Sequence, residues 1–303
     1  MIRGGNMASA RQRGHPQPGP AFLDCASAFQ ILARDCLTDI ETQRDKAYFG
    51  DAEAIRRMRV SITRLRAAVA FFAPMTVDRS WSGLKKDIVW LHAALGAARD
   101  SDVIASYARH KKYRAWAKRA GLAASHPRSS RDHRSLARCL RSARFFRLID
   151  GLTSWVGSGR WLSSPLVPES RLRAQSLRTY SRAKLGRWRD RLVHKGRHFA
   201  KMGNSRRHRL RIKAKRYRYV LKALMGLDLG NRNQWCREHE AIKRLQRTLG
   251  DLRDLESFRR AGAAACLPAN DQPGCPRGYR HQRKKLWAAA GAAFRDFKRV
   301  SGQ

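Results

Sequence analysis

The residues best suited to chemistry lie in the stretch from His208 to Tyr219, which has the sequence HRLRIKAKRYRY. Basic side chains recur there at helical spacing: His208, Arg211, Lys215, Arg218 and Lys222. Because residues three or four apart share one helix face, these side chains are expected to form one positive stripe. No Asp or Glu occurs between Asp190 and Asp228 to neutralise it. A stripe of a single sign favours binding of an extended polyanion.

A solvated helix face is the alternative explanation, because Lys and Arg are mostly exposed in any protein. An apolar stripe runs beside the cations, however, and comprises Leu210, Ala214, Tyr217, Leu221 and Leu224. The cations therefore flank a seam that must be buried, whereas a solvated face normally mixes charges of both signs. We favour the anion-binding interpretation, with His208 donating to a bound phosphate as a partly protonated imidazole.

The segment before this stretch adds cationic or ionisable side chains at the same spacing: Lys184, Arg187, Arg191, His194 and His198. The two histidines have an HxxxH spacing, but no Glu stands in the arrangement of a zinc hydrolase. We therefore expect no metal there and assign all five side chains to the anion site.

The basic pattern occurs a second time, 152 residues earlier, as Arg56, Arg59, Thr63 and Arg66, with Arg57 as a further cation. It accompanies the clearest helical periodicity of the chain: Ile55, Met58, Ile62, Leu65, Val69 and Phe72. Pro74 is expected to end this helix at residue 73, and Asp51 to cap its start.

A second motif is also duplicated, since LGAARDSD at 95–102 is echoed by LGDLRDLE at 249–256. Two repeated motifs in the same order predict an internal duplication. Helices are expected at roughly 22–48, 52–73, 80–118, 131–157, 171–201, 205–225, 233–262 and 278–300. The fold class is all-α, as two pseudo-symmetric four-helix bundles. Residues 1–20 are predicted to be a disordered basic tail, 21–165 the first helical half and 166–303 the second.

The two halves are expected to differ in charge. Asp35 and Asp39 stand at the positions that correspond to Arg187 and Arg191 in the second half. The second half is therefore predicted to be the better anion site.

Four carboxylates of the repeated LG motif could act as metal ligands or as a general acid and base: Asp100, Asp102, Asp254 and Glu256. Each lies close to Arg99 or Arg253 in the sequence, so we expect them to orient neighbouring cations. We expect no catalytic residue, no metal and no cofactor.

The 303 residues carry a formal net charge of +42, which points to a polyanionic partner such as nucleic acid, an anionic membrane surface or inorganic polyphosphate. Six cysteines form no CxxC pair and are expected to be free thiols in a reducing cytoplasm. No run is apolar enough to span a membrane.

The repeated pattern resembles the CHAD family, the conserved histidine α-helical domain. His208, Arg211, Lys215 and Arg218 match the family's basic helix in the second half. Arg59 and Arg66 match it in the first half, where Arg56 stands in place of the family's histidine and Thr63 in place of a basic residue. The resemblance covers residues 21–303.

That resemblance implies two pseudo-symmetric bundles with basic helices around a central groove or pore. It also implies binding of inorganic polyphosphate and association with polyphosphate granules in the cytoplasm. Some relatives carry a triphosphate tunnel enzyme domain ahead of this one, which we do not expect here. We therefore predict a non-enzymatic polyphosphate-binding protein. The alternatives are a nucleic-acid-binding helical protein and, less favoured, a metal-dependent phosphohydrolase using Asp100 and Asp254.

Overall fold

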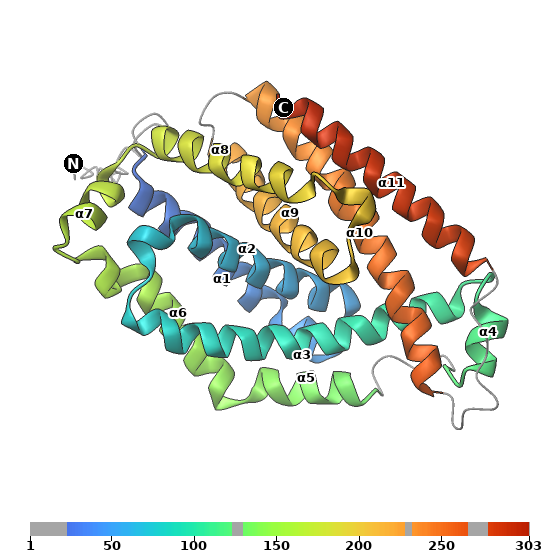
Figure 1. The fold of residues 1–303 in the computed structure, drawn as a ribbon. Helices are drawn as coiled ribbons and strands as arrows, with labels where there is room; N and C mark the ends of the chain where they lie inside the picture. The colour runs from blue at the N-terminus through green and yellow to red at the C-terminus, as the bar shows by residue number, and fades with distance from the viewer. Residues whose placement is uncertain (1–22, 123–129, 228–231, 266–277, 303) are drawn as a thin grey trace, which may run out of the picture.

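The computed structural model describes residues 23–122, 130–227, 232–265 and 278–302, and it is helical almost throughout (Figure 1). Its helices are α1 (Cys25–Tyr48), α2 (Ala52–Thr76), α3 (Arg79–Arg109), α4 (Arg114–Arg119), α5 (Arg131–Arg141), α6 (Ala143–Ser158), α7 (Val167–Ala174), α8 (Leu177–Gly196), α9 (Asn204–Met225), α10 (Arg232–Ala265) and α11 (Tyr279–Val300). Two short 3₁₀ turns, η3 (Arg160–Leu162) and η4 (Phe199–Lys201), connect neighbouring helices. In the described ranges, the only strand-like pairing is one backbone bridge between Asp24 and Ser176. The all-α prediction is confirmed, whereas the predicted tail lies outside the described residues.

The first three helices begin at aspartates, whose side chains accept hydrogen bonds from backbone N–H groups of the first turn. Asp24 accepts from Ser27 N at 2.7 Å, Asp51 from Ala54 N at 2.6 Å and Asp78 from Trp81 N at 3.0 Å. Such caps satisfy donors that have no partner within the helix. The predicted cap at Asp51 is confirmed.

The helices pack through the two predicted apolar stripes. All members of the stripes on α2 and α9 are buried, from Ile55 to Phe72 and from Leu210 to Leu224. α2 packs against α1 and α3, and α10 packs against α9 and α11. These two groups of helices meet where α2 contacts α9 and where α3 contacts α10. Figure 1 places α2 and α9 near the centre of the molecule. The cationic positions beside both stripes are thereby brought to one place.

One predicted helix end is wrong. α2 continues through Pro74 to Thr76 instead of stopping at residue 73. Proline lacks an N–H and disturbs the turn before it, but the last turn of a helix has few bonds left to lose. Val77 N donates to Ala73 O at 3.3 Å and Thr76 Oγ1 to Phe72 O at 3.2 Å, which holds this turn.

Three long predicted helices are interrupted. The 80–118 helix divides at His110, where the backbone is extended, and the 131–157 helix divides at Ser142, whose hydroxyl caps α6 by accepting from Phe145 N. The 171–201 helix divides at Gln175, because its carbonyl accepts from Cys25 N at 3.1 Å while Leu177 N donates to Leu23 O at 2.9 Å. These last bonds pair segments far apart in the chain, so local periodicity could not predict them.

The four cysteines in the described ranges are free, as predicted: Cys25, Cys36, Cys139 and Cys236. Burial raises the pKa of the Cys25 and Cys36 thiols to about 12, so both stay protonated at neutral pH. Cys266 and Cys275 lie outside the described residues. Among the described helices, none combines the length and apolarity that crossing a bilayer requires.

Gly196 and Gly186 offer a matched test of how tightly α8 packs. A Cβ at Gly196 would lie 2.0 Å from the Cζ atom of Phe294 on α11, a buried ring stacked on Phe199. At Gly186, in the middle of the same helix, a Cβ would have no described atom within 4 Å. We therefore expect Gly196→Ala to lower the free energy of unfolding by about 1–3 kcal/mol. Gly186→Ala should raise it by about 0.5–1 kcal/mol, because alanine favours the helix. Urea unfolding followed by circular dichroism measures both, and equal midpoints for the two variants would contradict the packing described.

Candidate anion-binding site

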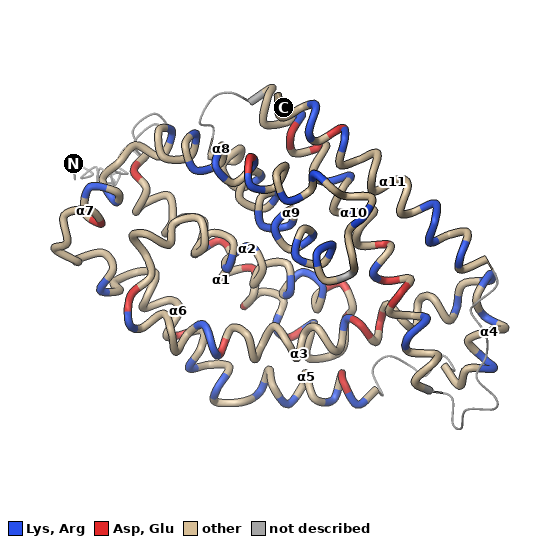
Figure 2. The backbone as a smooth tube through the Cα atoms, in the orientation of Figure 1, with Lys and Arg blue, Asp and Glu red and all other residues tan. Residues whose placement is uncertain are grey.

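A central cavity of about 270 Å³ lies between α2 and α9, with α3 and α10 beside them. Five of its lining residues were predicted site residues: Arg59, Arg66, His208, Arg211 and Lys215. Figure 2 shows how strongly Lys and Arg gather along α9. The helix faces predicted from the sequence thus meet around one space.

The cations of this cavity are poorly solvated. Burial, with the neighbouring Arg253, lowers the pKa of both Arg59 and Arg211. Burial, followed by repulsion from Arg59 and Arg211, lowers the pKa of Lys215 to about 7. The Arg59 Nε atom is buried, and it has no hydrogen-bond partner among the described residues. A bound anion would supply the missing acceptor and the missing negative charge.

His92 of α3 lines the cavity and was not predicted. Its Nε2 lies 3.4 Å from Thr63 Oγ1, and the same hydroxyl accepts from Lys215 Nζ at 3.2 Å. Burial, then Arg59 and Lys215, lowers the pKa of His92 to about 3, so the ring is neutral at neutral pH. The spacing could have indicated that His92 faces the interior. His92 comes four residues after the buried Ile88 and three before the buried Leu95, so it shares their helix face.

His208 lies exposed at the edge of the cavity. Burial and the charges of Arg211 and Arg253 lower its pKa, so the imidazole loses its proton more readily than usual in the free protein. The predicted partly protonated form is therefore less favoured in the free protein, and a bound anion would raise the pKa again.

The carboxylates of the repeated LG motif hold other residues in place. Asp100 Oδ2 accepts from Arg253 Nη2 at 3.2 Å and so fixes one cation at the cavity wall. Asp102 is buried on the far side of α3, where its Oδ1 lies 3.0 Å from His133 Nε2 and ties α3 to α5. Burial is the main cause that raises the pKa of Asp254. The orienting role predicted for Asp100 is confirmed, and no three His, Cys, Asp or Glu side chains gather as a metal site in the described parts of the chain.

Two predicted first-half cations lie outside the cavity. Arg56 and Arg57 are exposed on α2, and both pair with Glu53, at 2.6 and 3.0 Å. Asp35 and Asp39, which were expected to weaken the first half, instead pair with Arg64. These carboxylates neutralise cations on the outer surface and leave the central cavity untouched.

A second cavity, of about 300 Å³, adjoins the first on the side of α8. Its cationic lining comprises Lys184, Arg191, Lys213 and Arg216. Arg216 lines both cavities, so the two share a wall. Two of these residues, Lys184 and Arg191, were predicted.

A third cavity, of about 460 Å³, adjoins the first at the start of α9. His208, Arg211 and Arg253 line both, and Arg207, Arg209 and Arg260 extend the basic surface. The outer cavities draw their cations from the second half alone, whereas the central one includes Arg59 and Arg66. The predicted inequality of the halves thus applies to the flanks most strongly. In the central cavity the first half contributes Arg59 and Arg66, and the second half contributes Arg211, Lys215, Arg216 and Arg253.

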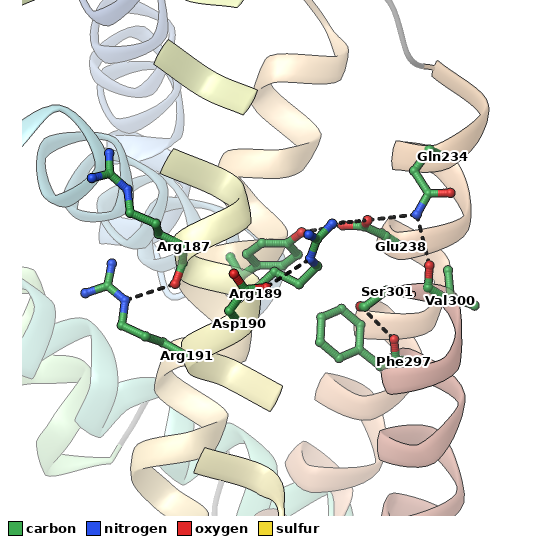
Figure 3. A network of polar contacts seen from close by, with 10 residues as sticks. Arg187, Arg189, Asp190, Arg191, Gln234, Glu238, Phe297, Val300 and Ser301 are labelled. Atoms are coloured by element: carbon green, nitrogen blue, oxygen red, sulfur yellow. Dashed lines mark hydrogen bonds and ion pairs between the residues drawn. The ribbon is translucent and has the colours of Figure 1, made fainter. Parts of the chain in front are cut away.

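The remaining predicted residues do not line these cavities. Arg218 Nε donates to Gln246 Oε1 at 2.5 Å on α10, and Lys222, His194 and His198 are exposed elsewhere. Arg187 is exposed on α8, and Figure 3 shows it beside Arg191.

A buried carboxylate, Glu238 of α10, positions α9 for this arrangement. It accepts from Tyr217 Oη, from Arg189 Nη1 at 3.3 Å and from Gln234 Nε2 at 3.0 Å (Figure 3). Because the three donors come from α9, α8 and α10, this contact fixes the rotation of α9 about its axis. The network was not predicted, since it depends on three separated segments.

Comparisons with known proteins identify the family and the fold. A family model described as the CHAD domain matches residues 31–296. Among solved structures, the CHAD domain from the plant Ricinus communis is similar with a TM-score of 0.67 and 23% identity, over 95% of this chain and 97% of that one. PptA from Streptomyces chartreusis is similar with a TM-score of 0.61 and 16% identity, over 93% of this chain and 100% of that one. No curated protein sequence matches the chain. At these identities the two structures show the shared fold.

Lys215 allows the repulsion in the central cavity to be measured. The unfolded chain keeps this ammonium protonated up to pH about 10.5, but the folded protein only up to about 7. Between these pH values, unfolding is therefore coupled to the uptake of one proton by Lys215. Lys215 lowers the free energy of unfolding most at about pH 7 and below, and this effect becomes smaller as the pH rises towards 10.5. We expect Lys215→Met to be more stable than the wild type near pH 7, by at least about 1 kcal/mol, with the gap closing towards pH 10.5.

Denaturant unfolding across this pH range measures the gap. The exposed Lys222→Met variant on the same helix controls for the loss of one positive charge. A Lys215→Met variant that is less stable than the wild type at pH about 7 would contradict the described burial of an uncompensated cation.

Proposed function

This chain belongs to the CHAD family, whose model spans residues 31–296, and we propose that it binds inorganic polyphosphate without cleaving it. Polyphosphate binding is the known property of that family. The observation that carries the proposal for this chain is the central cavity, where Arg59, Arg211 and Lys215 lie half-buried together and no carboxylate is part of the lining.

The chemistry of the cavity supports this ligand. Guanidinium groups donate paired N–H groups that match phosphate oxygens, and such charge-assisted bonds contribute roughly 1.5–3 kcal/mol each. The adjoining cavities provide further cations in line, at Arg216 on one side and Arg207 on the other. A linear chain of phosphates can contact all of them in succession.

A single observation weighs against single-stranded nucleic acid as the ligand. Single-stranded nucleic acids bind by stacking bases on aromatic rings, in addition to their phosphate contacts. Tyr219, the aromatic ring next to the cations of the central cavity, is buried, and Arg218 lies over it at 4.4 Å and Lys215 at 5.7 Å. The ring has no face free for a base.

We further infer that the cavity lies on the pseudo-two-fold axis of an internal duplication, between two helical bundles formed by the halves 21–165 and 166–303. Residues next to such an axis must lie close to their own counterparts. Thr63 and Lys215 stand 152 residues apart at matching positions of the repeat, and they are hydrogen-bonded to each other at 3.2 Å. Asp100, whose counterpart in the repeat is Asp254, pairs at 3.2 Å with the preceding residue, Arg253, and so joins the two copies of the LG motif.

Binding can be tested in a filter assay, which measures how much long-chain polyphosphate the purified protein retains at different salt concentrations. We expect retention that weakens as salt rises, because binding releases counterions. After hours of incubation with Mg²⁺ or Mn²⁺, the chain length on a gel should be unchanged. Shortened chains would contradict the non-enzymatic part of the proposal, and no retention at low salt would contradict binding.

Location in the cell follows from the same proposal. We expect a fluorescent fusion to lie in the cytoplasm and to gather at polyphosphate granules when the cell makes them. A diffuse signal in granule-rich cells would contradict this part alone.

Substitutions at the cavity positions of α2 and α9, with a control on the outer face of α2, test the site directly. Arg59→Gln and Arg211→Gln should each weaken polyphosphate binding by about tenfold to a hundredfold, because each removes a buried charge-assisted contact. The matched control is Arg57→Gln on α2, which removes the same charge from an exposed residue paired with Glu53. It should change the affinity by less than about threefold.

Competition with labelled long-chain polyphosphate measures the affinities, and circular dichroism checks that each variant is folded. If Arg57→Gln weakens binding as much as Arg59→Gln, polyphosphate binds the outer surface and the cavity is not the site.

A further inference from the structure

Lys215 is the only lysine among the residues that line the central cavity. Its Nζ donates to Thr63 Oγ1 at 3.2 Å, and that hydroxyl donates in turn to Arg59 O at 2.8 Å. Because the hydroxyl hydrogen is directed at the carbonyl, Thr63 serves as an acceptor for the amine and leaves its lone pair free. A neutral side chain thus holds the amine in place without blocking its nucleophilic side.

The Lys215 amine is in part neutral near physiological pH. Its pKa of about 7 leaves roughly half of it unprotonated at pH 7, whereas a lysine with a pKa of 10.5 has only about one part in three thousand in this form. Burial is the main cause, followed by the charges of Arg59, Arg211, Arg218 and Arg253. The neutral amine is the nucleophilic form, and desolvation beside other cations is a recognised way to activate a lysine.

The cavity offers stabilisation to an anion attached at this amine. Its lining includes no carboxylate. The buried Nε of Arg59 has no hydrogen-bond partner among the described residues. A carboxylate on Nζ would supply both an acceptor and a negative charge. The arginines that line the same space are Arg59, Arg66, Arg211, Arg216 and Arg253.

These surroundings select the kind of reagent that fits. Acylation would convert the amine to a neutral amide, and an aldehyde would give an imine, so neither product supplies the missing negative charge. Carbon dioxide gives a carbamate, which is itself a carboxylate. The molecule is small and uncharged, so it can enter a cavity of about 270 Å³ by the edge where His208 is exposed. His92, whose ring is neutral at neutral pH, adds no charge that would oppose the step.

We propose that Lys215 is a site of reversible carbamylation by carbon dioxide, which places a carboxylate among the cations of the central cavity. The amine lone pair attacks the carbon of CO₂ and forms the N–C bond, while one C=O electron pair moves onto oxygen. The nitrogen releases one proton to solvent, so the balance is R–NH₂ + CO₂ → R–NH–COO⁻ + H⁺. Protonation of the nitrogen reverses the step and returns CO₂.

The consequence for polyphosphate rests on the proposed function. Carbamylation changes the charge at Lys215 from +1 in the ammonium form to −1, and the new carboxylate competes with phosphate for Arg59 and Arg211. A phosphate beside Lys215 has the reverse effect, because it favours the ammonium form, which cannot attack CO₂. Carbon dioxide and polyphosphate are therefore mutually antagonistic at this cavity.

Trapping the carbamate tests the modification without polyphosphate. A trialkyloxonium salt converts a carbamate to a stable ester, which peptide mass spectrometry then assigns to a residue. With the wild-type protein at fixed dissolved CO₂ and pH about 7.5, we expect Lys215 to be trapped at least about tenfold more than Lys222, an exposed lysine of the same helix. Equal trapping at the two residues, or none at Lys215, would overturn the proposal.

Lys213 provides a stricter comparison within the same protein. Burial, then Lys195 and Arg191, lowers its pKa as well, but Lys213 lines the adjoining cavity on the side of α8. We expect Lys215 to be trapped at least about threefold more than Lys213. If both lysines were trapped equally, the central cavity would not be what selects the amine, and the assignment would be overturned.

A matched pair of variants tests the stabilising cations. Arg59→Gln removes the guanidinium without a partner at Nε and should lower trapping at Lys215 by at least about threefold, although the amine remains. Arg57→Gln removes the same charge from an exposed residue paired with Glu53 and should leave trapping unchanged. Circular dichroism checks that both variants are folded. Equal trapping in the two variants would contradict stabilisation by the cavity.

The effect on binding is measured with long-chain polyphosphate at fixed pH and ionic strength, with chloride replacing bicarbonate in the control. Wild-type affinity should fall by about threefold to tenfold as CO₂ rises, whereas Lys215→Met should show no dependence on CO₂. An unaffected wild type, or an equal fall in Lys215→Met, would overturn the antagonism. If the wild type bound no polyphosphate at any CO₂ level, the proposed function would be rejected, and trapping would still decide the modification.

Discussion

Repulsion between half-buried cations is the constraint on which the rest of this structure depends. Arg59, Arg211 and Lys215 come from two helices far apart in the sequence, and they face one another across one cavity. Taking a charge out of water is unfavourable, and burial is the main cause of the lowered pKa of each group. Asp100 and Asp254 offset part of this cost for Arg59 and Arg211, whereas the causes for Lys215 include no carboxylate. The apolar stripes of α2 and α9 offset it by burying their full length. Stability and charge are thus separated onto adjacent faces of the same two helices.

The contact between Thr63 and Lys215 shows how the structure moderates that repulsion. If a lysine occupied position 63, its ammonium would meet that of Lys215 near the same point. The hydroxyl instead accepts from Lys215 at 3.2 Å and lies beside the neutral ring of His92. Threonine at position 63, in place of a basic residue, therefore reduces the repulsion at the centre of the site, where like charges would approach closest.

The sequence predicted the helical class, the buried stripes and five of the residues that line the cavity. It did so because helical periodicity places side chains on faces without any tertiary information. It missed Arg207, Arg216 and Arg253, since nothing local distinguishes a cation that lines a cavity from one in solvent. Arg56 and Arg57 were predicted together with the cavity cations for the same reason, but they lie outside the cavity. The interruption at Gln175 and the Glu238 network depend on contacts between distant segments, which spacing does not encode.

The lowered pKa of Lys215 has a further thermodynamic consequence. Near neutral pH the free protein holds this amine only partly protonated, because its pKa is about 7. An anion that settles beside it favours the ammonium form and draws a proton from solution. Association at this cavity is then coupled to hydrogen-ion uptake, so its measured heat depends on the ionisation enthalpy of the buffer. Acidification of the surroundings would tighten the complex, and release of the ligand would return the proton.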